Sequence, residues 1–414
     1  MERKKEMLRY EWKKVFGKTS SRIALLILLA VMGVTCFFAT DVSWVDENGD
    51  THSGPGAVAR LREAQKEWAG YLDEDAVRRV IEENRRIQSL PEARTDNLRD
   101  SQITYGRKQG IMEIRELLNN SFAGGFREYD YYRVDSLRPE DAPYFYENRP
   151  RLLREWLAGE AKDQFSEEEK AFLTRQYESL ETPFYYDYAM GWSRLFEYAP
   201  TVVMITMLVL GYLVAGIFSS EFSWKSDAIF YTSLYGRDRA VRAKIGAGFC
   251  LVTGIYFAIF LLYSGIVLAY LGTDGMDLAV QAVSGSWKCF YPITVWQKYL
   301  LIAGGGYVGC LFISFLSMLV SAKTRSAVVA VMVPFVLIFL PSFLSSISSQ
   351  TVQKIIGLLP NQLLQTGMAL NLFNLYPAGG KIWGAVPILL VLYSLLTMVL
   401  WPVIYREYRH KQVS

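Results

Sequence analysis

The stretch TVVMITMLVLGYLVAGIFS, residues 201–219, contains no Asp, Glu, Lys, Arg or His. An α-helix rises 1.5 Å per residue, so about 20 apolar residues cross the ~30 Å hydrocarbon layer of a bilayer. A stretch of this length and purity therefore predicts a membrane-spanning helix.

Five other stretches have the same character, at 23–40, 245–271, 299–320, 327–344 and 385–405. Together they predict an all-α polytopic membrane protein with six transmembrane helices. The alternative for 23–40 is a cleaved signal peptide. A span is favoured, because 22 residues precede this stretch and a poor small-residue cleavage pattern follows it.

The charged residues are unevenly distributed between the apolar stretches. Residues 41–198 hold 32 of the 41 acidic residues and 22 of the 44 basic ones. This predicts a hydrophilic, mostly helical domain between the first two spans, followed by a five-helix membrane region at 199–414. Within the domain, apolar spacing predicts helices over 58–87, around 111–118, over 151–161 and from Ser166. The first of these could continue from the first span as a stalk.

Lys and Arg in the short flanks predict the orientation. Eighteen lie in the flanks on the side of the two termini and four in the short loops on the other side. Cytoplasmic loops of membrane proteins carry such an excess. We therefore expect both termini to be cytoplasmic and residues 41–198 to be extracytoplasmic. Because residues 41–198 contain no cysteine, this domain has no disulfide framework.

Residues 1–22 are predicted to form a cytoplasmic amphipathic helix at the membrane interface. Leu8, Trp12 and Phe16 recur on one helical face, while Lys13 lies on a cationic face suited to anionic lipid. The alternative is a plain basic flank that only fixes the topology.

The loop 219–244 is too long for a tight connection and too short for a domain. Together with the six spans it resembles the membrane subunits of bacterial ATP-binding-cassette (ABC) exporters of the second permease class. Glu221, Leu234, Arg239 and Lys244 match the loose pattern of that family. The proline that usually precedes the arginine is missing, and Gly236-Arg237-Asp238 stands in its place.

The resemblance implies that 219–244 is a cytoplasmic coupling segment that docks on an ATPase. The residues expected to carry this contact are Glu221, Lys225, Asp227, Tyr231, Leu234, Arg237, Arg239 and Lys244. It further implies two ABC ATPase subunits that carry ATP and Mg, a second permease chain, and a location in the bacterial cell membrane. An outer re-entrant segment is expected at 351–375.

Motifs of other functional classes are absent from the sequence. No phosphate-binding Gly-x-x-x-x-Gly-Lys-Ser/Thr motif and no metal-binding or triad pattern is present. We therefore expect no catalytic residue, metal or cofactor on this chain, and ATP hydrolysis on a separate partner. No basic domain suggests nucleic-acid binding. The predicted spans also lack the ionisable groups that ion-coupled carriers use.

The function expected from these observations is export of an amphipathic peptide, lipid or drug-like cargo, driven by a separate ATPase. The alternative is a membrane-anchored receptor or assembly scaffold that binds a ligand through its outer domain.

Overall fold

The computed structural model describes residues 2–95, 97–233, 236–344 and 350–409. The structure is mostly helical, with 72% helix and 5% strand. Among the described residues, six helices are long and apolar enough to cross a membrane. These are α2 (Thr19–Thr40), α9 (Met190–Ser223), α11 (Val241–Leu271), α12 (Val295–Thr324), α13 (Ala327–Leu344) and α16 (Ala385–Arg409). The prediction of six such helices is confirmed, although α9 begins inside the range assigned to the hydrophilic domain.

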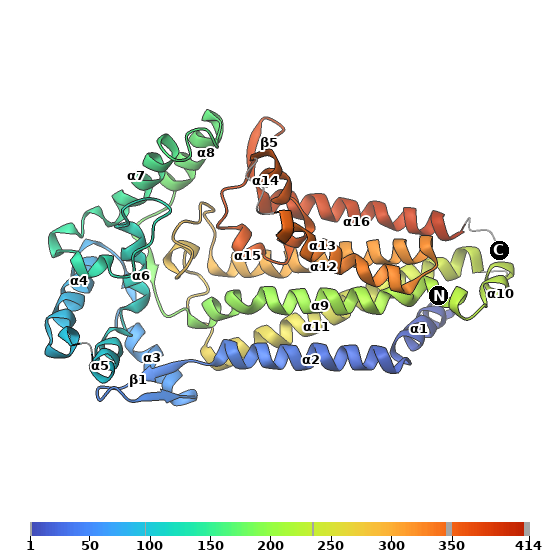
Figure 1. Cartoon of the computed structure of the whole chain (residues 1–414), viewed down its shortest axis with the longest axis horizontal. Coiled ribbons are helices and arrows are strands. Elements are labelled where there is room, and N and C mark those ends of the chain that lie inside the picture. The colour runs from blue at the N-terminus through green and yellow to red at the C-terminus, as the bar shows by residue number, and fades with distance from the viewer. Residues whose placement is uncertain (1, 96, 234–235, 345–349, 410–414) are drawn as a thin grey trace.

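The six helices run side by side as a bundle (Figure 1). Helix α9 is central and packs against α2, α11, α12 and α13, while α16 packs mainly on α12. Helix α13 comes close to α9 because Gly211 faces Pro334. A Cβ atom at Gly211 would lie 2.7 Å from the Pro334 ring, so a larger residue there would push the two helices apart.

Residues 41–189, called the polar domain below, lie at one end of the bundle (Figure 1). The helices of this domain are α3 (Pro55–Lys66), α4 (Glu74–Ser89), α5 (Leu98–Lys108), α6 (Met112–Ser121), α7 (Tyr144–Ala158) and α8 (Glu167–Glu178). Its short 3-10 turns are η1 (Pro91–Arg94), η2 (Arg133–Ser136) and η3 (Pro139–Asp141), and its strands are β1 (Ser43–Val45), β2 (Thr51–Ser53), β3 (Gly70–Tyr71) and β4 (Tyr185–Tyr186). The helix predicted to start at Ser166 is α8, and Ser166 and Glu169 form a capping box at its start.

Two details predicted for this domain are wrong. The segment 58–87 is not one helix, because β3 pairs with β4 and thereby separates α3 from α4. No stalk continues from the first span, because the β1–β2 hairpin lies between α2 and α3. Between α3 and α4, pairing of the backbone with a second strand interrupts the helix that the apolar spacing favours.

The loop 272–294 between α11 and α12, called the junction loop below, is part of the core of the polar domain. It includes the short turn η5 (Val280–Ala282). Trp287 packs with Phe145 in that core. The buried Arg149 guanidinium donates to the carbonyl oxygens of Trp287 and Cys289 at 3.1 and 2.8 Å. The polar domain is therefore fastened to the bundle through α11 and α12 as well as through α2 and α9.

Residues 350–384 form short elements at the same end of the bundle. These are α14 (Gln350–Ile356), η6 (Pro360–Leu363), α15 (Thr366–Ala369) and the hairpin of β5 (Leu375–Ala378) and β6 (Lys381–Gly384). The turn η6 packs against α12, α13 and α16. The outer re-entrant segment expected at 351–375 stays a prediction, and the hairpin of β5 and β6 was not expected.

Candidate functional site

Three chain segments meet at the far end of the bundle, opposite the polar domain. Helix α1 (Glu2–Phe16), the last turn of α16, and the connection from α9 to α11 all lie there (Figure 1). That connection contains the short helix α10 (Asp227–Thr232) and a π-helical turn over Gly236–Ala240. This is the segment that the sequence predicted to be the coupling segment.

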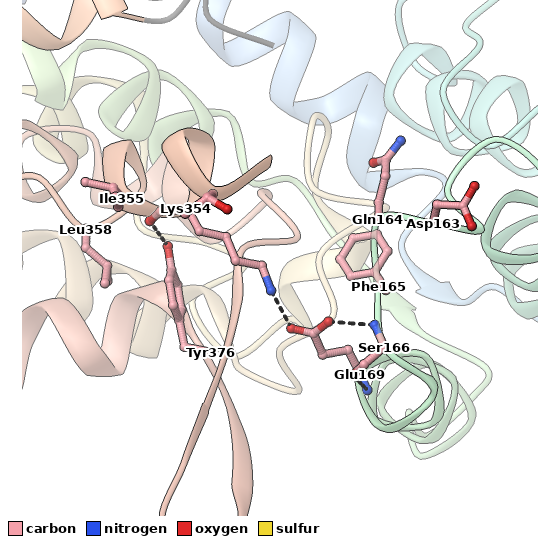
Figure 2. Close-up of a pocket in the computed structure, with 10 residues that line it drawn as sticks. Asp163, Gln164, Phe165, Ser166, Glu169, Lys354, Ile355, Leu358 and Tyr376 are labelled. Carbon is pink, nitrogen blue, oxygen red and sulfur yellow. Dashed lines mark hydrogen bonds and ion pairs between the residues drawn. The ribbon is translucent and has the colours of Figure 1, made fainter. Parts of the chain in front are cut away.

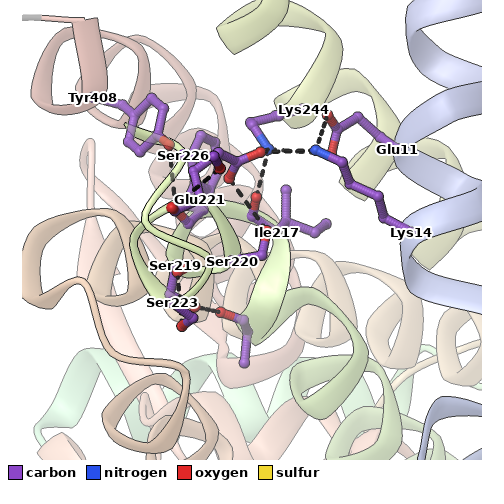
Figure 3. Close-up of polar contacts among 12 residues, drawn as sticks. Glu11, Lys14, Ile217, Ser219, Ser220, Glu221, Ser223, Ser226, Lys244 and Tyr408 are labelled. Atoms are coloured by element: carbon purple, nitrogen blue, oxygen red, sulfur yellow. Dashed lines mark hydrogen bonds and ion pairs between the residues drawn. The ribbon is translucent and has the colours of Figure 1, made fainter. Parts of the chain in front are cut away.

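A buried ion network ties the ends of α9 and α11 together. The Lys244 ammonium, which is fully buried, lies 2.7 Å from Oε1 of Glu221. It also donates to the carbonyl oxygen of Ile217, one turn before Glu221 on α9, at 2.8 Å. Figure 3 shows that these groups point toward one another.

Helix α1 supplies the other half of the network. Oε2 of Glu11 lies 3.2 Å from Nζ of Lys244, and Nζ of Lys14 lies 2.8 Å from Oε1 of Glu221 (Figure 3). Lys14 also lies 3.4 Å from Oε1 of Glu11. The four residues Glu11, Lys14, Glu221 and Lys244 are called the ion network below. Two ammonium groups alternate with two carboxylates, so the buried cluster is neutral.

Such a cluster is stable only while it is complete. Burying a charge costs several kcal/mol unless an opposite charge and hydrogen bonds compensate it. Lys14 shows the balance: burial acts to lower its pKa, but the carboxylates of Glu11 and Glu221 together raise the pKa above its usual value. Lys14 is therefore charged at neutral pH, and its attraction to both acids holds α1 on the bundle.

Contacts of the apolar face of α1 fix its position. The Trp12 indole donates to the carbonyl oxygen of Ala247 on α11 at 3.2 Å, and Val15 is buried in the core of the bundle. Of the residues predicted for an interfacial helix, Leu8 is half-buried, whereas Trp12, Lys13 and Phe16 are exposed. The helix is thus partly embedded in the bundle, and its placement at a bilayer surface stays a prediction.

The predicted coupling residues fall into three groups. Glu221 and Lys244 are buried in the ion network, so they can act on a docked protein only by positioning α10. Lys225, Arg237 and Arg239 are exposed. Leu234 and the side chains of Asp227 and Tyr231 lie outside the described residues. Their contact with an ATPase stays a prediction.

The exposed residues of this region form a mixed cationic and apolar surface. Trp224 and Ile229 are 54% and 74% exposed. They lie on the same connection as Lys225, Arg237 and Arg239. These five residues are called the end surface below. Behind it, Phe230 packs on Tyr408 of α16 and lies 5.6 Å from the Lys244 ammonium.

Sequence reasoning missed Glu11 and Lys14. One signal for Glu11 is present: Leu8, Glu11, Trp12 and Val15 follow the spacing i, i+3, i+4 and i+7. An acid on the apolar face of a basic helix needs a buried cation as a partner. The partner itself could not be found in this way, because Lys244 lies 233 residues away.

A cavity of about 650 Å³ opens at the other end of the bundle, between the polar domain and α14. Its walls carry Phe165 and Glu169 from the start of α8, and Lys354, Leu358 and Tyr376 from 350–384 (Figure 2). Lys354 spans it to reach Glu169 at 2.8 Å. The cavity has both apolar and charged walls, as a site for an amphipathic molecule requires.

Comparison of the chain with models of protein families, with curated proteins and with solved structures finds no match. Among the described residues, no group of three or more His, Cys, Asp or Glu side chains could hold a metal ion. The structure establishes a mostly helical protein, in whose described residues six helices are suited to a multi-pass membrane protein.

Proposed function

We propose that this chain is the membrane-spanning permease subunit of a bacterial ABC exporter. A separate ATPase would drive it, and an amphipathic peptide, lipid or drug-like molecule would be its cargo. The observation that carries this proposal is the end surface together with the ion network beneath it. The end surface lies on the connection between α9 and α11, and the buried charges of the ion network link the ends of these two helices to α1, as transmission of force from a docked partner would need.

In this proposal the end surface is cytoplasmic and docks on one of two ABC ATPase subunits, which bind ATP and Mg. A second permease chain completes the transporter. The polar domain then lies outside the cell, where its cavity faces the released or incoming cargo. The excess of Lys and Arg on the side of the termini supports this orientation.

The orientation is tested by labelling single introduced cysteines in intact cells with a membrane-impermeant maleimide. Leu98→Cys lies on α5 of the polar domain, where Leu98 is 75% exposed, and Ile229→Cys lies on the end surface. Position 98 should react in intact cells, and position 229 only after permeabilisation. Reaction of position 229 in intact cells excludes coupling to a cytoplasmic ATPase.

The partner is tested by photo-crosslinking in native membranes. A benzophenone amino acid at position 229 should crosslink to a polypeptide that a photoreactive ATP analogue also labels. The same probe at position 98 is the matched control and should give no such product. The purified complex should hydrolyse MgATP in a vanadate-sensitive manner.

The scaffold alternative predicts a different outcome. If position 229 yields no ATP-binding product and the purified chain carries no ATPase activity, the exporter proposal is wrong. A receptor or assembly scaffold would then be the better description, since the cavity at the polar domain does not depend on ATP.

A further inference from the structure

A second, smaller cavity lies at the end-surface side of the bundle, between α1, α2, α9 and α13. It has a volume of about 120 Å³, whereas a single water needs only ~10–15 Å³. A group of several heavy atoms therefore fits. Its lining includes Lys14, Lys18, Ser21, Leu213 and Val331.

The charge at this cavity is positive. Lys14 belongs to the ion network, which is neutral as a whole and therefore supplies no surplus charge. Lys18 adds a cation; its ammonium lies 5.8 Å from the Trp224 ring. The amino end of α2 adds a partial positive charge, because Lys18 is its N-cap residue and gives no side-chain cap. An anion is favoured here.

A buried hydroxyl lines the same cavity. Ser21, in the first turn of α2, is only 4% exposed. Within the described part of the chain, its hydroxyl has no hydrogen-bond partner. The hydroxyl opens onto the cavity, so it can donate a hydrogen bond to a ligand held there. Together with the uncapped helix and Lys18, the hydroxyl forms donor groups suited to phosphate oxygens.

The apolar part of the lining indicates the source of the phosphate. Leu213 and Val331 belong to α9 and α13, two of the candidate spans. Next to Val331, the α13 residues Val328 and Met332 are 76% and 56% exposed and would face acyl chains in a membrane. A free phosphate gains nothing from these apolar residues. A membrane lipid can place its acyl chains against them and its phosphate in the cavity.

We propose that this cavity binds the phosphate of an anionic phospholipid in the leaflet at this end of the bundle. The lipid phosphate contacts Lys18, Ser21 and the amino end of α2, while its acyl chains run along α13. The site stands independently of the exporter proposal.

The test uses the full chain in nanodiscs of phosphatidylcholine alone or with one-tenth phosphatidylglycerol, with thermal unfolding and lipid retention in native mass spectrometry as readouts. Phosphatidylglycerol should raise the unfolding temperature and remain bound after partial delipidation. One lysine near a membrane surface contributes ~1 kcal/mol to lipid binding, so Lys18→Gln should weaken retention about fivefold. Lys13→Gln, on the exposed side of α1, is the matched control and should leave retention unchanged.

A second variant tests the cavity without removing a charge. A Cβ atom at Gly216 would lie 3.1 Å from the Lys18 ammonium, so Gly216→Val fills the space. It should reduce retention as Lys18→Gln does. Equal effects of Lys18→Gln and Lys13→Gln would show diffuse attraction and overturn the proposal. So would stabilisation by inorganic phosphate alone, or no preference for phosphatidylglycerol. None of these readouts requires an ATPase, so they are separate from the tests of the exporter.

Discussion

Replacing Lys244 by Met tests the ion network most directly. Methionine keeps the length of the side chain and its tendency to form helix, but it removes the buried cation. Glu221 and Glu11 then share one ammonium, that of Lys14. One carboxylate is left buried without a full partner, which is the costly outcome for a buried pair.

The size of the effect follows from the burial. Lys244 is fully buried, and the side chains of Glu221 and Glu11 are 4% and 10% exposed. Breaking such a pair costs ~3–5 kcal/mol. The double variant Lys244→Met/Glu221→Gln removes both charges and leaves Glu11 with Lys14 as a neutral pair. We expect it to recover more than half of that loss.

The assay is thermal unfolding in nanodiscs, followed by intrinsic tryptophan fluorescence, together with the rate of trypsin cleavage near α1. A loss of this size lowers the unfolding temperature by roughly 10 °C. The control Lys13→Met changes an exposed lysine and should stay within ~0.5 kcal/mol of wild type. The reasoning is refuted if Lys244→Met melts with the control, or if the double variant is no more stable than the single one.

Three further predictions concern the polar domain. Burial and the neighbouring Glu116 raise the pKa of Glu113 from 4.5 to about 7. Between these two pH values the folded domain therefore binds more protons than the unfolded chain. Stability should fall by up to ~3 kcal/mol as the pH rises through this range, and Glu113→Gln should flatten the curve of unfolding temperature against pH. Arg149→Met removes the donor to two carbonyl oxygens of the junction loop and should cost ~3 kcal/mol, with faster hydrogen exchange in that loop. Lys354→Met removes the cation that pairs with Glu169, whose side chain is only 6% exposed and, among the described residues, keeps just the Ser166 amide as a donor; the stability should fall by ~1–3 kcal/mol, and hydrogen exchange in α14 should increase.

The spans could be predicted because each depends only on local composition. A helix in a soluble protein would not normally stay without a charged residue over a run as long as 201–219, so this run predicts a span. The start of α8 was equally accessible, since a capping box at Ser166 is a local hydrogen-bond pattern. The end of the second span could not be predicted from local composition. Helix α9 extends to Ser223, and Glu221 near this end pairs with the buried cation of Lys244.

The wrong helix prediction and the missed ion network share a physical cause, which is pairing between residues that are distant in the sequence. Gly70 and Tyr186 meet in a two-stranded ladder, so the helix expected over 58–87 is interrupted. Lys14 and Glu221 are 207 residues apart, and the sequence around either residue does not indicate that the other is its partner. Apolar spacing reports which face of an element is buried, but it does not report what covers that face.

Ties between α9 and α11 at both ends determine how the bundle could move. At the end-surface side, Lys244 of α11 donates to Ile217 of α9 at 2.8 Å. At the polar-domain side, the Tyr263 hydroxyl donates to the Leu195 carbonyl oxygen at 2.8 Å, and the Trp192 indole donates to Thr273 at 3.2 Å. A push on α10 therefore cannot be absorbed by sliding of α9 along α11. On the exporter proposal, the two helices carry the displacement together to the polar domain. The motion that opens a path is then expected at α13 and α16, the two spans that are least buried inside the structure.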